Sequence, residues 1–436
     1  MTASETIAAV ATPAGQGGVG IVRISGPAAF AAAQALSGHP PEVGRVRFAR
    51  LRNQHGELID EGVVLAFAGP HSFTGEDVIE MQIHGGPWLL ARLMDCLCRE
   101  HPIRAARPGE FSERAFHNGK LDLVQAEAIA DMISAGSDQA ARAAQRSLSG
   151  VFSGRCHALH EALLDLRMRL EAAIDFPEED IDFLSDPELM ARWQALHVEH
   201  QHLLEDARHG VQLSQGLTVV LAGAPNAGKS SLLNYLSRDE TAIVSAIAGT
   251  TRDLLRSAVQ LAGVPVTLID TAGLRDSDDP VEQEGVRRAT KAIASADFLL
   301  HVCAPDIPDS PVPQTQARII TVHNKADLGA EPVGWMDSQH SQIRLSARTG
   351  EGVDSLIEAL VGHVGESDFS ARQRHVDALV RLGRHLQEAG QRLQQGAGDI
   401  AAEELRLGQR ELGEITGQVH SDELLGRIFS SFCIGK

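Results

Sequence analysis

The octapeptide Gly223–Ser230, Gly-Ala-Pro-Asn-Ala-Gly-Lys-Ser, constrains this chain more than any other feature. It fits the P-loop pattern G-x-x-x-x-G-K-[ST] and stands between an apolar run at 217–222 and a segment with a helical pattern. Its glycines let the backbone curl so that N–H groups and the helix N-terminus face phosphate groups. Lys229 is predicted to reach the β- and γ-phosphates, and Ser230 to bind Mg²⁺. The segment therefore predicts an α/β domain that holds a nucleoside triphosphate.

Three later segments predict that this nucleotide is GTP, and each follows a short apolar run typical of a strand. In Asp270-Thr-Ala-Gly273, the aspartate can hold the Mg²⁺ shell and the glycine can approach a γ-phosphate. In Asn324-Lys-Ala-Asp327, the last carboxylate can accept hydrogen bonds from guanine N1–H and N2–H₂, which adenine does not offer in that form. Ser346-Ala-Arg348 is expected to complete the base pocket with a backbone N–H. Four such segments in this order predict a guanine-nucleotide site.

Position 274 departs from the Ras-type pattern. A Ras-type enzyme places a water-orienting glutamine directly after the glycine, whereas Leu274 is apolar and cannot orient water. Polar groups for hydrolysis must come from elsewhere, and the nearby candidates are Arg252, Arg275, Glu282 and Glu284. Gly249-Thr-Thr-Arg-Asp253 supplies a threonine for Mg²⁺ in a loop that can order around the γ-phosphate. The side-chain oxygen of Asn226 can coordinate a monovalent cation, which could do the charge work of an arginine finger.

Between 216 and about 365, helical segments alternate with five short apolar runs, at 217–222, 264–269, 298–303, 319–323 and 343–345. This alternation is typical of a doubly wound, largely parallel sheet. Only the interval 304–318 separates two of these runs. Four prolines exclude a full helix there: Pro305, Pro308, Pro311 and Pro313. The Ras-like domain is therefore predicted to be shortened on one flank.

The flanking segments have other patterns. Residues 1–118 contain strand-like runs with period two, such as Val78–His84, and predict a small α+β domain. Leucines at 159, 163, 166 and 170 recur at helical spacing. We therefore predict a multidomain α/β fold with an α+β domain at 1–118, the first part of an all-helical domain at 119–215, an inserted P-loop GTPase domain at 216–368 and the second helical part at 369–436.

Composition excludes several classes of protein. Asp and Glu total 58 against 39 Lys and Arg, a net charge of −19, so whole-chain electrostatic capture of nucleic acid is not expected. No run approaches the roughly 20 apolar residues that cross a bilayer, and the N-terminus lacks the basic region of a signal peptide. Five cysteines give neither a disulfide framework nor paired CxxC spacing. We expect a soluble, cytoplasmic protein without membrane contact.

Together, Gly223–Ser230, Gly249–Asp253, Asp270–Arg275 and the terminal Cys433-Ile-Gly-Lys436 resemble the MnmE (TrmE) family of tRNA modification GTPases, over essentially the whole chain. The resemblance implies that the N-terminal domain is a tetrahydrofolate-binding fold that also forms a homodimer. It implies a flavin-dependent partner protein in a heterotetramer, tRNA as substrate, and an aminomethyl-type group built on C5 of the wobble uridine. The implied cofactors are K⁺, Mg²⁺ and 5-formyltetrahydrofolate or a related tetrahydrofolate.

The resemblance also implies roles for individual residues. It places K⁺ at Asn226, Ser245, the Ile247 carbonyl and Thr250, and Mg²⁺ at Ser230 and Thr251. Glu282 is the implied catalytic acid that orients water, and Lys229 is the other implied catalytic residue. The implied folate contacts are Arg23, Glu80, Lys120 and Lys436, with Cys433 as a candidate reactive thiol. The expected GTP contacts are Asn226, Ala227, Gly228, Lys229, Ser230, Ser231, Ser245, Ala246, Ile247, Ala248, Gly249, Thr250, Thr251, Asp270, Thr271, Ala272, Gly273, Asn324, Lys325, Asp327, Ser346, Ala347 and Arg348.

Two other classes of GTPase stay open as alternatives. A ribosome-assembly or translation-associated GTPase switch, without modification chemistry, predicts a basic RNA-binding domain, and the sequence offers none. A membrane-associated G protein with self-assembling helical arms predicts a basic amphipathic stretch, and the helical segments contain no convincing one.

Overall fold

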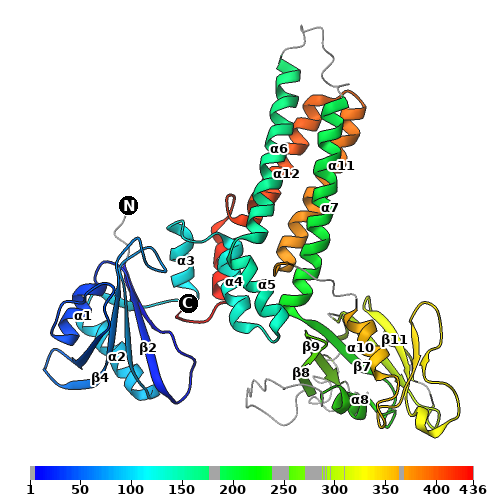
Figure 1. Ribbon diagram of the computed structural model, residues 1–436, viewed down its shortest axis with the longest axis horizontal. Coiled ribbons are helices and arrows are strands. Elements are labelled where there is room, and N and C mark those ends of the chain that lie inside the picture. Colours follow the sequence, from blue (N-terminus) through cyan, green and yellow to red (C-terminus); the bar gives the residue numbers. More distant parts are fainter. Residues whose placement is uncertain are drawn as a thin grey trace. The chain divides into compact units, whose positions relative to one another are not determined.

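The computed structural model describes residues 5–175, 187–237, 255–270, 287, 290, 292–294, 296–308, 310–362 and 368–435. The chain divides into two compact units, one made of 1–130 and 409–436 and the other of 131–408 (Figure 1). The boundaries between the units fall inside two helices, α4 (Leu123–Ser134) and α12 (Gly398–Thr416). The four-part division of the sequence stays a prediction.

The first unit is built on a six-stranded sheet in the order β3-β4-β5-β2-β1-β6. Its strands are β1 (Thr6–Val10), β2 (Gly17–Ser25), β3 (Arg47–Arg52), β4 (Leu58–Phe67), β5 (Val78–Gly85) and β6 (Ile103–Ala105). Only the β1–β6 pair is parallel. Helices α1 (Ala29–Ser37) and α2 (Pro87–Glu100) pack on one face, over a core that includes Val22, Ile79, Met81 and Leu93.

A smaller helical cluster completes the first unit. Helix α3 (Glu110–His117), the start of α4 and α13 (Asp422–Ser430) meet around Leu123, Phe429 and Phe432. Residues from both ends of the chain thus share one hydrophobic core.

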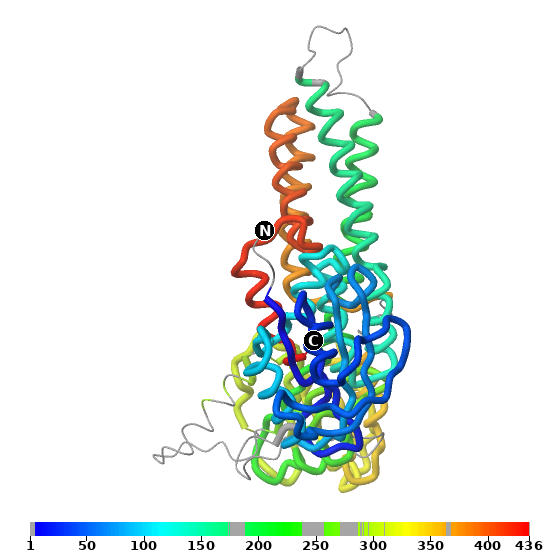
Figure 2. The backbone as a smooth tube through the Cα atoms, turned by 90° about the vertical axis from the view of Figure 1, so that its left-hand side faces the viewer, coloured from blue at the N-terminus to red at the C-terminus, as the bar shows by residue number. Residues whose placement is uncertain are grey.

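One part of the second unit is helical and contains α5 (Asp138–Leu148), α6 (Val151–Asp175), α7 (Pro187–Gln215), α11 (Gln373–Gln394) and most of α12. Figures 1 and 2 show α6, α7, α11 and α12 running side by side. The leucines at 159, 163, 166 and 170 are all buried, which confirms the predicted helix face. Left-handed glycines separate short helices before α6: Gly119 lies between α3 and α4, and Gly150 lies between α5 and α6.

The second unit also holds a seven-stranded sheet in the order β12-β13-β11-β10-β7-β9-β8. Its strands are β7 (Leu217–Ala222), β8 (Leu255–Leu261), β9 (Val264–Asp270), β10 (Phe298–Cys303), β11 (Arg318–His323), β12 (Gly334–Trp335) and β13 (Gln342–Arg344). The five central strands are parallel, and β8 and β12 are antiparallel edges. Helices α8 (Lys229–Leu236) and α10 (Val353–Val361) pack on one face. This sheet confirms the predicted fold class.

The opposite face is thinly covered near β11 and β13. Within the described part of 304–317 there is no helix, and between 329 and 341 the only regular element is the two-residue strand β12. Alternate residues of β11 are accordingly half-buried, whereas every residue of β10 is buried. Among the described helices, none combines the length and apolarity that a bilayer crossing requires.

Candidate nucleotide site

The loop between β7 and α8 has the backbone that a phosphate-binding loop needs. Gly223, Asn226 and Gly228 have φ values of 140°, 66° and 96°, so the chain turns sharply three times before α8 begins at Lys229. Left-handed backbone between right-handed residues turns successive N–H groups inward, and the helix N-terminus adds positive potential. The loop therefore offers backbone donors to an anion, as the octapeptide predicts.

Lys229 lies within this loop rather than in solvent. Its side chain is buried, and Nζ donates to the carbonyl oxygens of Gly223 at 2.7 Å and Ala224 at 2.9 Å. Burial lowers the pKa of Lys229, while the nearby Asp270 opposes that shift. The ammonium group is thus held where a phosphate chain would run, with little water to screen it.

Ser230 and Asp270 are brought together although they are 40 residues apart in sequence. The Ser230 hydroxyl donates to Asp270 Oδ2 at 3.0 Å, and Asp270 is buried at the carboxyl end of β9. Hydroxyl and carboxylate oxygens are the ligands that Mg²⁺ prefers, and this ion is commonly held by such a pair beside substrate phosphates. The two side chains therefore fit the predicted Mg²⁺ site.

Asn324 joins the P-loop to the base loop. Its Nδ2 donates to the Ala227 carbonyl at 3.0 Å, and its Oδ1 accepts from Ala347 N–H at 2.9 Å. The side chain is 4% exposed, so both hydrogen bonds are formed away from water. An asparagine can make both bonds at once because its amide carries a donor and an acceptor.

Asp327 is held in place by the third loop of the site. Its Oδ1 accepts from the Ser346 hydroxyl at 2.7 Å, and its Oδ2 lies 3.4 Å from a guanidinium nitrogen of Arg348. Lys325 reaches elsewhere, because its Nζ lies 2.8 and 2.9 Å from the two carboxylate oxygens of Asp306. Sequence reasoning missed Asp306, which lies in the proline-rich interval and belongs to no motif.

Asp327→Asn tests this base pocket. The substituted amide presents a donor where guanine also presents donors, so GTP binding should weaken by roughly 10- to 150-fold, the range for a lost hydrogen bond to a charged group. Xanthosine triphosphate, which carries an acceptor at that edge, should become the preferred nucleotide. Titrations with both nucleotides measure the change, and the exposed Asp354→Asn serves as control. An unchanged preference for GTP would remove Asp327 from the pocket.

The remaining predicted nucleotide residues lie outside the described parts of the chain. These are Ser245, Ala246, Ile247, Ala248, Gly249, Thr250, Thr251, Thr271, Ala272, Gly273 and Glu282, together with Leu274, Arg252, Arg275 and Glu284. The described residues therefore show the phosphate loop, the Ser230–Asp270 pair and the base loops. The assignments of Glu282 and of the K⁺ ligands other than Asn226 stay predictions.

A second group of predicted residues meets in the first unit. Arg23 Nε donates to Glu80 Oε1 at 2.9 Å across the β2–β5 pair, and a guanidinium N–H of Arg23 also donates to the Gly435 carbonyl at 3.3 Å. The Arg23 guanidinium lies 5.6 Å from the ring centre of Phe73 and 5.8 Å from that of Phe111.

The C-terminal tail lies against the same sheet. The Cys433 carbonyl accepts from Gly109 N–H at 3.4 Å, and Cys433 itself is exposed. Lys120 Nζ donates to the Pro70 carbonyl at 3.0 Å, and Lys436 lies outside the described residues. Arg23, Glu80 and the tail are thus brought together, while no described contact joins Lys120 to them.

Comparison with known proteins gives the same picture over the whole chain. Residues 123–433 match the family model described as the MnmE helical domain, and residues 6–120 match that of the GTP-binding protein TrmE N-terminus. The tRNA modification GTPase MnmE of Stutzerimonas stutzeri is 51% identical over 453 residues, covering 100% of this chain and 99% of the relative. That of Pectobacterium atrosepticum is 50% identical over 454 residues, covering 100% of both.

Solved structures give a partial likeness. The G domain of the T. maritima FeoB iron transporter is 23% identical and covers 34% of this chain and 99% of that one, with a TM-score of 0.26. The Methanococcus jannaschii FeoB G domain is 17% identical and covers 34% of this chain and 97% of that one, with a TM-score of 0.24. The two family models and the full-length relatives are decisive: this chain belongs to the MnmE family of tRNA modification GTPases.

Proposed function

We propose that this chain is a potassium-activated GTPase that works with a flavin-dependent partner to build an aminomethyl-type group, such as carboxymethylaminomethyl, on C5 of the tRNA wobble uridine. As a member of its family, it is a GTP hydrolase that acts in tRNA modification. The observation that carries the nucleotide half of the proposal is Asn324, which fastens the phosphate loop to the base loops through two buried hydrogen bonds. Because this chemistry needs GTP and tRNA, we propose a cytoplasmic location.

The residues divide the work of hydrolysis among them. Lys229 and the backbone of the loop bind the phosphates, and Ser230 with Asp270 would hold Mg²⁺ there, joined by Thr251. Bound Mg²⁺ and K⁺ supply positive charge against the charge that develops on the phosphates. Asn226, Ser245, the Ile247 carbonyl and Thr250 are the proposed K⁺ ligands. Glu282 is the proposed acid that orients the attacking water, because Leu274 cannot.

Replacing K⁺ by Na⁺ at equal ionic strength should slow GTP hydrolysis at least roughly 10-fold, the scale of a lost charge in the transition state. A site of several oxygen ligands selects its cation by cavity size and ligand number. Turnover measured in the two salts tests this, with GDP affinity as the control, which should change little. Equal turnover in both salts would contradict the role of K⁺.

In the first unit, the contacts of Arg23 support a folate-binding role. A guanidinium paired with Glu80 and flanked by two phenyl rings can bind the carboxylates or ring carbonyl of a tetrahydrofolate, while Glu80 accepts from a pterin N–H edge. We propose 5-formyltetrahydrofolate or a related tetrahydrofolate as the ligand, with Lys120 and Lys436 as further contacts. Cys433, at the adjoining tail, is the proposed reactive thiol.

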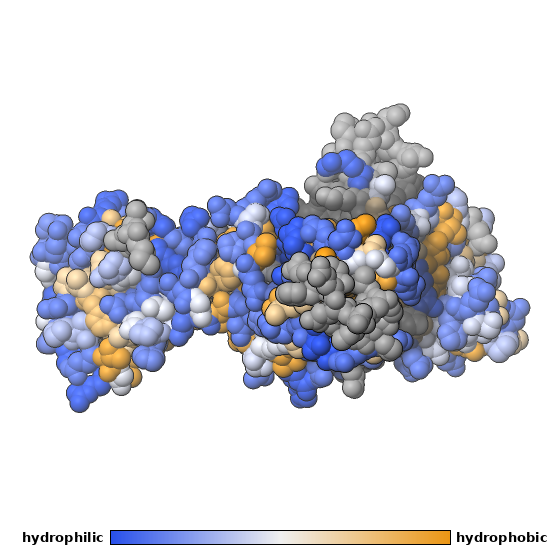
Figure 3. Space-filling model, turned by 90° about the horizontal axis from the view of Figure 1, so that it is seen from above, coloured by the Kyte–Doolittle hydropathy of each residue, from blue (hydrophilic) through white to orange (hydrophobic). Residues whose placement is uncertain are grey.

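The sheet face opposite α1 and α2 supports the proposed homodimer. Phe48 on β3 is 68% exposed and lies opposite Val63 on β4. Leu65 and Phe67 follow Val63 by two and four residues, so they lie on the same face of β4. Figure 3 shows hydrophobic residues grouped among hydrophilic ones on the face of the molecule that is seen from above. An exposed apolar patch on a sheet commonly marks a protein interface. The flavin-dependent partner and tRNA complete the proposed assembly.

The experiment that tests the function is nucleoside analysis of the wobble uridine in cells that lack this protein. We expect the modified nucleoside to disappear and to return when the wild-type gene is restored. A variant with weakened GTP binding, such as Lys229→Met, should restore it less well than the wild-type gene does. Full modification in the cells without the protein would contradict the proposal.

A further inference from the structure

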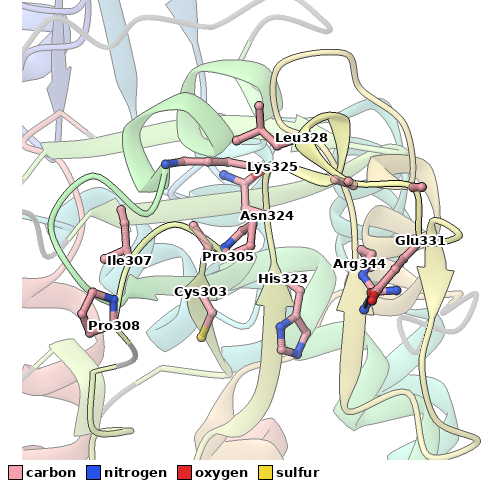
Figure 4. A pocket seen from close by; sticks show the side chains of 14 residues that line it. Cys303, Pro305, Ile307, Pro308, His323, Asn324, Lys325, Leu328, Glu331 and Arg344 are labelled. Carbon is pink, nitrogen blue, oxygen red and sulfur yellow. Dashed lines mark ion pairs between the residues drawn. The ribbon is translucent and has the colours of Figure 1, made fainter.

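A cavity of about 640 Å³ lies beside the base loop. Side chains from 303–308 and 323–331, together with Arg344, line it (Figure 4). Small-ligand sites commonly enclose roughly 300–1,000 Å³, so this cavity is large enough for a small molecule. Of its lining residues, only Asn324 and Lys325 belong to the expected GTP contacts.

Cys303 contributes a thiol to this cavity, and two imidazoles lie next to it. His301, two residues earlier on β10, has its Nδ1 3.4 Å from Cys303 Sγ. His301 is only 3% exposed, and its Nε2 lies 3.2 Å from the Ser310 hydroxyl. His323 also lines the cavity and is the neighbour of Cys303 across the β10–β11 ladder. A nucleophile, a base and a group that orients the base thus stand in one row, which is the arrangement that activates a nucleophile.

The thiols of α2 provide a contrast. Burial raises the pKa of Cys96 to about 12 and also raises the pKa of Cys98, so both stay protonated and weakly nucleophilic. Cys433 is exposed at the tail, so its reaction with a disulfide shows what solvent exposure of a thiol alone produces. Cys303 is itself only 8% exposed, so burial alone does not distinguish it from Cys96. What distinguishes it is the His301 imidazole beside its sulfur and the cavity that it lines.

The carboxyl end of β10 touches both halves of the nucleotide site. The Cys303 carbonyl accepts from Asn324 N–H at 2.8 Å. Gly223 of the P-loop lies so close that a Cβ there would be 2.2 Å from the Val302 carbonyl oxygen. Asn324 and Lys325 also line the cavity itself. A group attached to Cys303 would lie in the cavity beside Asn324, whose two buried hydrogen bonds hold the P-loop to the base loops.

We propose that Cys303 is a thiol–disulfide exchange site for a small disulfide that enters this cavity, and that the mixed disulfide weakens nucleotide binding. The Cys303 thiol gives its proton to His301 Nδ1, and the thiolate attacks one sulfur of the disulfide R–S–S–R. A bond forms between Cys303 Sγ and that sulfur while the original S–S bond breaks. The released R–S⁻ takes up the proton from His301. The incoming disulfide is the oxidant, and its departing half is the reduced product.

The coupling to nucleotide rests on the proposed GTPase function, and the test keeps the two apart. The full-length chain is treated with oxidised glutathione, the adduct is located by peptide mass spectrometry, and the Kd for GDP is measured before treatment, after it and after reduction. We expect an adduct at Cys303, a Kd raised at least about 10-fold, within the usual range of coupling between sites, and full recovery on reduction.

Matched variants separate the thiols. Treatment should leave the Kd of Cys303→Ser unchanged, and Cys98→Ser should respond as the wild type does. By linkage, saturating GDP must lower the equilibrium constant for adduct formation by the same factor. Untreated protein that does not bind GDP would contradict the proposed function and with it the coupling. Protein that binds GDP but gains no adduct at Cys303, or whose adduct leaves the Kd unchanged, overturns this inference.

His301 is a positioning and proton-accepting residue in this scheme, and a pH profile tests that role. In the wild type, the exchange rate at Cys303 should depend less steeply on pH near neutrality than in His301→Asn, because the imidazole accepts the thiol proton. The Kd of untreated His301→Asn for GDP shows whether the variant is folded. The same pH profile in both proteins overturns the role of His301.

Discussion

Gly228→Ala should weaken GTP and GDP binding at least roughly 30-fold, since overpacking and left-handed strain each cost about 1–3 kcal/mol. Gly228 has a φ of 96°, and an ideal Cβ on it would lie 2.1 Å from Asn324 Nδ2. Asn324 cannot yield without losing its hydrogen bonds to the Ala227 carbonyl and to Ala347 N–H. The added methyl group thus separates the phosphate loop from the base loops.

Titration with a fluorescent GDP analogue measures this effect. Gly154→Ala is the matched control, because Gly154 lies in the interior of α6 and a Cβ there meets nothing within 4 Å. That control should keep the wild-type affinity and gain a little stability, as alanine favours a helix over glycine by about 1 kcal/mol. Wild-type affinity in Gly228→Ala would contradict the position of Asn324 against the loop.

Lys229→Met should reduce GTP affinity by roughly 30-fold to several thousand-fold, which is the scale of losing one partner of a buried charge pair, about 2–5 kcal/mol. The same substitution should not lower the thermal unfolding midpoint of the protein without nucleotide. Burial disfavours the ammonium group, and methionine fills a similar volume without that cost. The substitution should therefore weaken GTP binding without lowering the stability of the protein that holds no nucleotide.

The lowered pKa of Lys229 fixes the sign of a pH effect. The unfolded chain holds this proton up to about its ordinary pKa of 10.5, whereas the folded chain releases it earlier. Between those two values the unfolded state binds more protons, so this lysine makes the folded state more stable as the pH rises. The difference in the free energy of unfolding between wild type and Lys229→Met should narrow or reverse over the pH range between the two pKa values. A difference that stays constant across it would contradict the burial of a charged lysine.

Most strands of the second unit could be predicted because each is specified by a short segment of sequence. Five short apolar runs and an octapeptide give β7, β9, β10, β11 and β13 almost to the residue, since a parallel sheet buries such runs on both faces. The antiparallel edge β8 was not predicted. It joins β9 through Ala262 and Gly263, both with positive φ, and this tight turn lacks the Asn-Gly or Asp-Gly pair that usually signals a hairpin.

Only those site residues that belong to sequence motifs could be predicted. The motifs identify Lys229, Ser230, Asp270, Asn324 and Asp327 as residues that face a nucleotide. They do not identify Asp306 as the partner of Lys325, because no spacing rule ties a residue of the proline-rich interval to the base loop. Such pairs arise from tertiary packing alone.

The bare sheet face beside β13 has a practical consequence. Most residues from 330 to 340 are exposed, so an added peptide in this connection would displace little buried surface. A small epitope or fluorescent reporter grafted between Ser338 and His340 should leave folding intact. This connection is therefore the natural place to attach a label that follows the domain through its catalytic cycle.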